Sequence, residues 1–168
     1  MGMEWIAAGP RPEPASDVRI ERHPALASAD QAGRFAPLEE PVQVQALGQP
    51  FRLDRLPYLL AKVGDKAVGA VSLALFGDDL VLLGFESQPE LGQPGICAAL
   101  LQEAAGVGRE IGRRRLLAPV TNADPLPLFF LQVEGFVLAE VNPYAGPERK
   151  GPHGILATHE IVLERAIG

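Results

Sequence analysis

Three apolar runs separated by short polar turns dominate the middle of the chain. They read YLLAKV, AVGAVSLALF and LVLLGFES, and they begin at Tyr58, Ala67 and Leu80. The turns between them, at 64–66 and 77–79, each contain Gly and Asp. Tight Gly/Asp turns between apolar runs are typical of antiparallel hairpins. The pattern therefore predicts an antiparallel meander of three strands.

Beyond the meander, the apolar positions change to helical spacing. One stripe at this spacing runs from 96 to 111 and is followed by Gly112, a residue type that commonly ends helices. A second helix is expected after Asp124 and Pro125, which suit the N-cap and first helical positions, and Gly135 ends it. Further strands are expected at 116–120, 136–141 and 155–167. The order predicts an α/β fold with a mixed sheet, antiparallel at first, with a strand–helix–strand crossover in its middle.

The front of the chain carries weaker patterns. Val18 and Ile20 alternate with polar neighbours and predict a short strand over 17–22, whereas 25–35 predicts a helix and 36–56 fits no single element. The sequence GPRPEP is typical of a solvated, disordered lead-in, which we place at residues 1–16. No later segment resembles an interdomain linker. One domain spanning residues 1–168 is expected.

Composition and charge narrow the class of protein. Hydrophobic residues make up 47% of the chain, yet no run approaches the ~18 consecutive apolar residues of a membrane span, and no secretory signal is evident. Cys97 is the single cysteine, which excludes an internal disulfide and fits a reducing cytoplasm. The net charge of −6 argues against nucleic-acid binding, and no His, Cys or acidic residues show metal-ligand spacing. We expect a cytoplasmic globular protein without membrane, nucleic-acid or metal partners.

The turn between the third apolar run and the first helix is the main candidate for a binding site. It reads Gly92-Gln93-Pro94-Gly95 and leads directly into the helix at Ile96. A helix N-terminus presents N–H groups outside the helix ladder and a partial positive charge, so such a turn can hold a phosphate-bearing ligand. Plain turn chemistry is the alternative interpretation of the two glycines.

Three segments, taken in order, carry a family resemblance. They are PELGQPGICAALL, TNADPLPLFFLQVEGF and GPHGILATHEIVLER, which begin at Pro89, Thr121 and Gly151. Together they resemble the acyl-CoA loop, the Asn-bearing strand end with its helix, and the chain ending of the GNAT superfamily of acyl-CoA-dependent N-acetyltransferases. The resemblance covers 58–165. It implies a GNAT-like fold in which two central parallel strands, 80–87 and 116–120, splay apart around acetyl-CoA.

The resemblance also implies how acetyl-CoA, the co-substrate, is held. The pantetheine arm pairs with backbone groups near one strand end, and the pyrophosphate caps the helix that follows the turn. A hydrogen bond to the cofactor and a structural cap are equal interpretations of the strand-end asparagine. The cofactor-binding residues that the resemblance implies are Phe85, Ser87, Gly92, Gln93, Pro94, Gly95, Ile96, Cys97, Ala98 and Asn122.

The implied chemistry is direct attack of a substrate amine on the thioester in a ternary complex. Glu86 is the predicted general base, because strand alternation places it on the same face as Gly84, a position often acidic in the family. A solvated strand-end acid is the alternative interpretation of Glu86. Cys97 is expected to be a small loop residue and not a nucleophile, because the resemblance implies no covalent step. Arg113, Arg114 and Arg115 suit a helix C-terminus better than a nucleotide phosphate.

Departures from the family pattern keep a second function in view. Gly92 stands where the family has Arg or Gln, and Leu131 where many members have the Tyr that protonates the leaving thiolate. The main prediction is an N-acetyltransferase acting on a small or peptide amine, with the loop bearing Tyr144 and His153 at the rim of the acceptor site. The alternatives are a non-catalytic module that binds acyl-CoA or a protein partner without turnover, and a scaffold that forms a homodimer.

Overall fold

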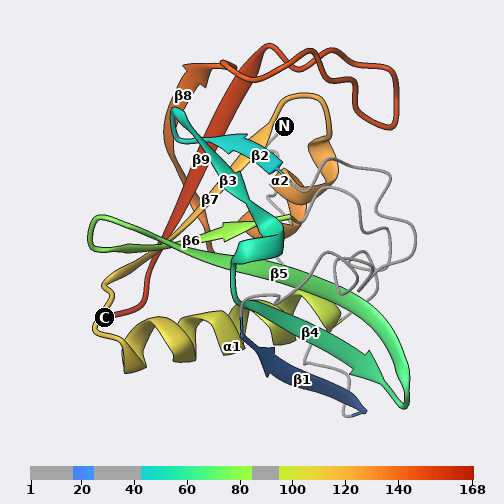
Figure 1. Ribbon diagram of the computed structural model, residues 1–168, viewed down its shortest axis with the longest axis vertical. Helices are drawn as coiled ribbons and strands as arrows, with labels where there is room; N and C mark the ends of the chain where they lie inside the picture. Colours follow the sequence, from blue (N-terminus) through green and yellow to red (C-terminus); the bar gives the residue numbers. More distant parts are fainter. Residues whose placement is uncertain (1–16, 25–42, 85–94) are drawn as a thin grey trace, which may run out of the picture.

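A mixed sheet of seven strands forms the centre of the part of the molecule that the structure describes (Figure 1). This computed structural model describes residues 17–24, 43–84 and 95–168. The strand order is β1-β4-β5-β6-β7-β9-β8. Neighbouring strands are antiparallel except for β6 and β7, which are parallel. The bounds are β1 (Val18–His23), β4 (Tyr58–Val63), β5 (Lys66–Phe76), β6 (Asp79–Leu83), β7 (Arg115–Thr121), β8 (Val137–Pro143) and β9 (His159–Ala166).

Two helices and a small hairpin cover the sheet. The helices are α1 (Ile96–Glu110) and α2 (Pro125–Val133), and the hairpin is formed by β2 (Gln43–Ala46) and β3 (Gln49–Arg52), followed by the 3-10 turn η2 (Leu53–Arg55). Asp124 caps α2 by accepting a hydrogen bond from the Leu126 N–H at 3.1 Å, and Pro125 occupies the first turn. The sequence signals at the start of α2 are therefore confirmed.

The two faces of the sheet have separate hydrophobic cores. Leu80 and Leu82 of β6 belong to the core that packs against α1 and α2, whereas Val81 and Leu83 belong to the core under the β2–β3 hairpin. Successive residues of a strand point to opposite faces, so a strand covered on both sides reads as a continuous apolar run. This double burial explains the long apolar runs of the meander.

The predicted meander is confirmed as β4, β5 and β6. The region 36–56, for which no element was expected, contains the β2–β3 hairpin. Its turn uses Leu47 at φ 52° and Gly48 at φ 76°, and a branched apolar residue is not the usual choice for the positive φ that such turns require. The last strand begins at His159 and not at 155, because 155–158 belong to a loop described below. The predicted lead-in at 1–16 and helix at 25–35 lie outside the described residues.

Two glycines in α1 give opposite predictions for substitution by Ala. A β-carbon on Gly106 would lie 3.9 Å from its nearest neighbour, Nη2 of Arg22, whereas one on Gly108 would collide with Cδ1 of Ile167. Ala lowers the conformational entropy cost of a helical position by about 0.5–1 kcal/mol relative to Gly. Gly106→Ala is therefore expected to raise the free energy of unfolding by that amount, and Gly108→Ala to lower it. Urea denaturation of both variants measures the difference, and equal effects would contradict this packing of α1.

Candidate functional site

The central parallel strands separate after a short paired stretch. The pairs between β6 and β7 are Asp79 with Arg115, Leu80 with Leu116, and Val81 with Leu117. Beyond them, β6 continues to pair with β5 as far as Leu83, and β7 with β9 as far as Thr121. The two strands thus stay in the sheet through their outer neighbours while their own ladder ends. This is the divergence that the sequence resemblance predicts at this place.

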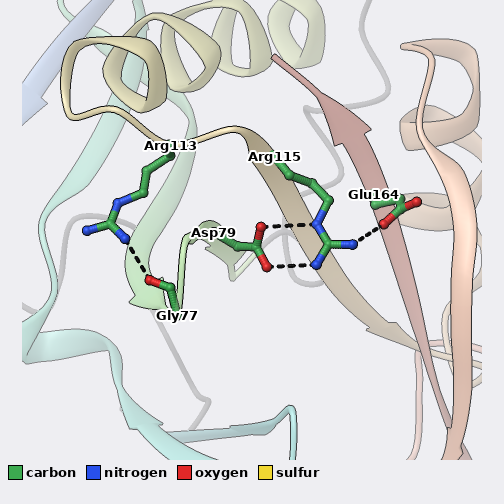
Figure 2. Close-up of polar contacts among 5 residues, drawn as sticks. All are labelled: Gly77, Asp79, Arg113, Arg115 and Glu164. Carbon is green, nitrogen blue, oxygen red and sulfur yellow. Dashed lines mark hydrogen bonds and ion pairs between the residues drawn. The ribbon is translucent and has the colours of Figure 1, made fainter. Parts of the chain in front are cut away.

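An ion-pair cluster holds the paired end of β6 and β7 together (Figure 2). The Arg115 guanidinium donates to both carboxylate oxygens of Asp79, at 3.0 and 2.8 Å, and also pairs with Glu164 of β9. Two-point contact between guanidinium and carboxylate fixes geometry as well as adding energy. We call Asp79, Arg115 and Glu164 the clasp. It joins three strands at the end opposite to the divergence.

The arginines that follow α1 bind the chain itself. Arg113 donates to the carbonyl oxygen of Gly77 at 2.6 Å, and the Arg114 carbonyl accepts a hydrogen bond from the Ile167 N–H (Figure 2 shows the first of these). Together with Arg115 in the clasp, these contacts tie the α1–β7 connection to its neighbours. The helix-dipole explanation is therefore incomplete, since Arg113 and Arg115 hold the sheet.

The N-terminus of α1 has the features of an anion site. Gly95 is its N-cap, with φ 90° and no side-chain cap hydrogen bond, and the helix ladder begins with the Ala99 N–H bonded to the Gly95 oxygen at 3.0 Å. The N–H groups of Ile96, Cys97 and Ala98 precede that first ladder bond. The first turn contains no acidic residue. Backbone donors and the helix dipole can therefore act together on an anionic ligand, without an opposing carboxylate in that turn.

Cys97 is a buried thiol and not an activated nucleophile. Its side chain belongs to the core beneath α1, and only 7% of the residue is exposed. Burial, with the nearby Glu134 carboxylate as the smaller cause, raises the pKa of Cys97 to about 12. The helix N-terminus would favour the thiolate, but desolvation outweighs it here. At neutral pH the thiol stays protonated, which agrees with its interpretation as a small loop residue.

Asn122 fastens a distant segment to the end of β7. Its amide oxygen accepts hydrogen bonds from the N–H groups of Thr158 and His159, both at 2.9 Å, and its Nδ2 donates to the Leu156 oxygen at 3.1 Å. Of the two roles considered for Asn122, the structure shows the structural one. A contact with a cofactor stays a prediction.

The segment 144–158 is a structured loop packed against the end of β7. The Tyr144 N–H donates to the Thr158 oxygen at 2.9 Å, and the Ala157 N–H to the Arg149 oxygen at 2.8 Å. Gly151 lies so close to the carbonyl of Ala123 that a β-carbon there would collide with it. We call residues 144–158 the arch. Its position depends on Asn122 and on the fact that residue 151 is glycine, which has no β-carbon.

Several predicted site residues lie outside the described residues. They are the candidate base Glu86 and the cofactor residues Phe85, Ser87, Gly92, Gln93 and Pro94. Gly84, which precedes them, has φ 89°. Gly95, Ile96, Cys97 and Ala98 lie at the start of α1, where Ile96 and Cys97 belong to the core that contains Leu80 and Leu82.

A buried carboxylate that the sequence analysis did not single out lies on β9. Glu160 is 7% exposed, and its Oε2 accepts a hydrogen bond from the Leu47 N–H at 2.9 Å. Burial raises the pKa of Glu160 and the Glu140 carboxylate adds to this rise, while the Leu47 hydrogen bond opposes it. The alternation of HEIVLERA places Glu160 on the face of Val162. Only the register of the hairpin, which sequence does not give, shows that this position is covered.

Two other kinds of site are absent from the part of the chain that the structure describes. The described residues contain no group of three or more His, Cys, Asp or Glu side chains that could hold a metal ion. None of their helices is both long enough and apolar enough to cross a membrane.

Comparison with known proteins gives structural neighbours only. No family model and no curated protein matches the chain. An IAA acetyltransferase from Bacillus cereus is 20% identical with a TM-score of 0.66, over 89% of this chain and 99% of that one. A GNAT family acetyltransferase from Elizabethkingia anophelis with acetyl-CoA bound is 17% identical with a TM-score of 0.65, over 90% and 99%. The ribosomal-protein-S18-alanine N-acetyltransferase of Escherichia coli is 16% identical with a TM-score of 0.52, over 66% and 68%. At these identities the likeness concerns the fold alone.

Proposed function

We propose that this chain, which has the GNAT fold, is an N-acetyltransferase that transfers the acetyl group of acetyl-CoA to a primary amine. The observation that carries the proposal is the combination of two features: the ladder between β6 and β7 ends at Val81 and Leu117, and α1 begins with Gly95 as its N-cap. A ligand with a diphosphate and a long polar arm matches both. The Elizabethkingia anophelis neighbour, whose structure contains acetyl-CoA, supports the choice of ligand.

Each part of the proposed site has one task. The N–H groups at the start of α1 bind the diphosphate, and the backbone near Phe85 and Ser87 pairs with the arm. Acetyl-CoA supplies the activated acyl group. A carboxylate takes the proton that the amine must lose, and Glu86 is the candidate from strand alternation. The acceptor is a small amine or a peptide amine; the S18-alanine enzyme among the neighbours acts on a protein.

One observation favours a second function, a module that binds acyl-CoA without turnover. Leu131 stands where the resemblance implies a Tyr acid, and its side chain is 0% exposed in the core beneath α1 and α2. It therefore supplies no proton to a leaving thiolate. If the chain is an enzyme, that proton comes from another group or from water.

Two measurements test the proposal and separate it from the alternative. Acetyl-CoA should raise the melting temperature, because a ligand that binds only the folded state stabilises it by mass action. Free thiol should then appear when acetyl-CoA is mixed with a panel of small and peptide amines. No thermal shift at millimolar acetyl-CoA would contradict both functions. A shift without thiol release across the panel would favour the binding module.

A further inference from the structure

We infer that Glu160 is the carboxylate that accepts the proton of the acceptor amine. This inference rests on the proposed function and assigns its proton-accepting step to Glu160 in place of Glu86. It stands on three observations, taken in turn below: the face of the sheet on which Glu160 lies, its level along the strands, and its fixed, buried carboxylate.

Glu160 lies on the opposite face of the sheet from the proposed diphosphate site. Ile96 and Cys97, at the start of α1, belong to the core that also contains Leu163 of β9. Val162, one residue away from Leu163, belongs to the core under the hairpin, and Glu160 shares the face of Val162. An arm that starts at the tip of α1 and passes between β6 and β7 emerges on the face of Glu160. A group that deprotonates the amine is needed on that face.

Glu160 also lies at the level where β6 and β7 have separated. It pairs with Thr121, the last residue of β7, whereas the last β7 residue paired with β6 is Leu117. At about 3.3 Å per residue, Thr121 is roughly 13 Å beyond that pair. Strand β9 follows β7 in the sheet, and neighbouring strands lie only about 4.8 Å apart. The carboxylate is therefore one strand away from the unpaired edge of β7.

The hairpin fixes the carboxylate, and Glu160 keeps only 7% of its surface exposed. The Leu47 N–H holds Oε2, and Leu47 itself is in the positive-φ region at 52°. Among the residues that the structure describes, the charged group that acts on Glu160 is Glu140 of β8. The residues paired with Glu160, Thr121 of β7 and Asn142 of β8, are uncharged, as is the hydrogen-bonded Leu47. Burial and Glu140 both raise the pKa of Glu160. A carboxylate whose pKa is raised toward neutrality is a stronger base for an ammonium group.

The proton balance of the step is complete. The acceptor arrives as an ammonium ion, and Glu160 takes one of its protons to give the free amine. The nitrogen then forms its bond to the acetyl carbon while the carbon–sulfur bond breaks. The second nitrogen proton goes to the departing sulfur to give the free thiol, and protonated Glu160 returns its proton to water. No oxidant, metal or further reactant is required.

Glu160→Gln separates this role from a purely structural one. The Gln amide oxygen can still accept the Leu47 hydrogen bond, so the hairpin keeps its partner while the base is lost. With the amine that gives most thiol, kcat should fall at least about 100-fold, whereas the thermal shift with acetyl-CoA should be unchanged. The acid limb of kcat/KM, which reports the pKa of Glu160 in the free enzyme, should disappear.

A neighbouring carboxylate provides a matched control. Glu140→Gln should keep full turnover and move the acid limb to lower pH, because it removes the like charge that raises the pKa of Glu160. Glu86→Gln compares the two candidate bases, because loss of the acid limb in that variant would assign the proton to Glu86. A readout besides activity is the titration of carboxyl carbons in protein labelled with ¹³C-Glu. The resonance that is missing in Glu160→Gln should titrate above the other Glu residues, and lower in Glu140→Gln.

Stability gives a second readout of the same carboxylate. The folded-state pKa of Glu160 is raised, so its contribution to stability is fully present at low pH and is lost as pH rises through that pKa. Above that pKa, Glu160→Gln should melt at the same temperature as wild type or higher.

Wild-type turnover in Glu160→Gln, or a retained acid limb, overturns the inference while the proposed function stands. A loss of turnover in Glu86→Gln alone also overturns it. A wild-type protein that releases no thiol with any amine overturns both.

Discussion

Replacing Gly95 with Glu is expected to abolish the thermal shift that acetyl-CoA gives the wild-type protein. Gly95 is the N-cap of α1, and its φ of 90° is a conformation that residues with a β-carbon rarely adopt. A Glu side chain would place a negative charge where we propose that the diphosphate binds, and it would also fill space that the ligand needs. At a concentration 100 times Kd, wild type should gain about 2.7 kcal/mol from the ligand. The variant should gain nothing.

Gly95→Asn is the matched control for this experiment. Asn is uncharged and tolerates the left-handed region better than other side chains. It should retain part of the shift, while Gly95→Glu retains none. Differential scanning fluorimetry over a series of acetyl-CoA concentrations measures both variants. A full shift in Gly95→Glu would show that the diphosphate does not bind at this helix end.

Gly151→Ala is expected to weaken acceptor binding while leaving acetyl-CoA binding intact. The added β-carbon would collide with the carbonyl of Ala123. Ala123 cannot easily give way, since its N–H is bonded to Oγ1 of Thr121 and the next residue caps α2. The arch must therefore move, at a cost of about 1–3 kcal/mol typical of overpacking. If the arch forms the rim of the acceptor site, its displacement should raise KM for the amine, and a loss of about 1.4 kcal/mol in acceptor binding would appear as a tenfold rise.

Gly154→Ala controls for a general disturbance of the arch. A β-carbon on Gly154 has no neighbour within 4 Å, but its φ of 75° makes Ala strained. The variant should lose about 1 kcal/mol of stability and keep the KM of wild type. Steady-state kinetics with the amine varied, at saturating acetyl-CoA, compare the two variants. An unchanged KM in Gly151→Ala would remove the arch from the acceptor site.

The parts of the fold that could be predicted are those with strong local signals. Gly/Asp turns between apolar runs predicted β4, β5 and β6, and Asp124-Pro125 predicted the start of α2. The β2–β3 hairpin was missed because its turn places Leu47 at positive φ, where local preference gives no signal and a contact with Glu160 helps to hold the backbone. Such tertiary contacts join positions that are far apart in sequence.

The candidate site also has parts that local sequence signals predict and parts that only tertiary contacts show. The start of α1 could be predicted because glycines beside a helical stripe mark it locally. The role of Asn122 could not be decided, since its partners at 156–159 are known only when β7 and β9 are in register. Glu160 could not be found, because alternation gives two faces for β9 but does not tell which one the hairpin covers.

The clasp has a consequence for the proposed binding of acetyl-CoA. Asp79, Arg115 and Glu164 lock three strands at one end, and the outer neighbours β5 and β9 keep β6 and β7 apart at the other. The separation of β6 and β7 is thus built during folding. If acetyl-CoA binds between these strands as we propose, it spends no binding energy on separating them, so more of that energy remains as affinity. The sheet is therefore preorganised for the proposed ligand.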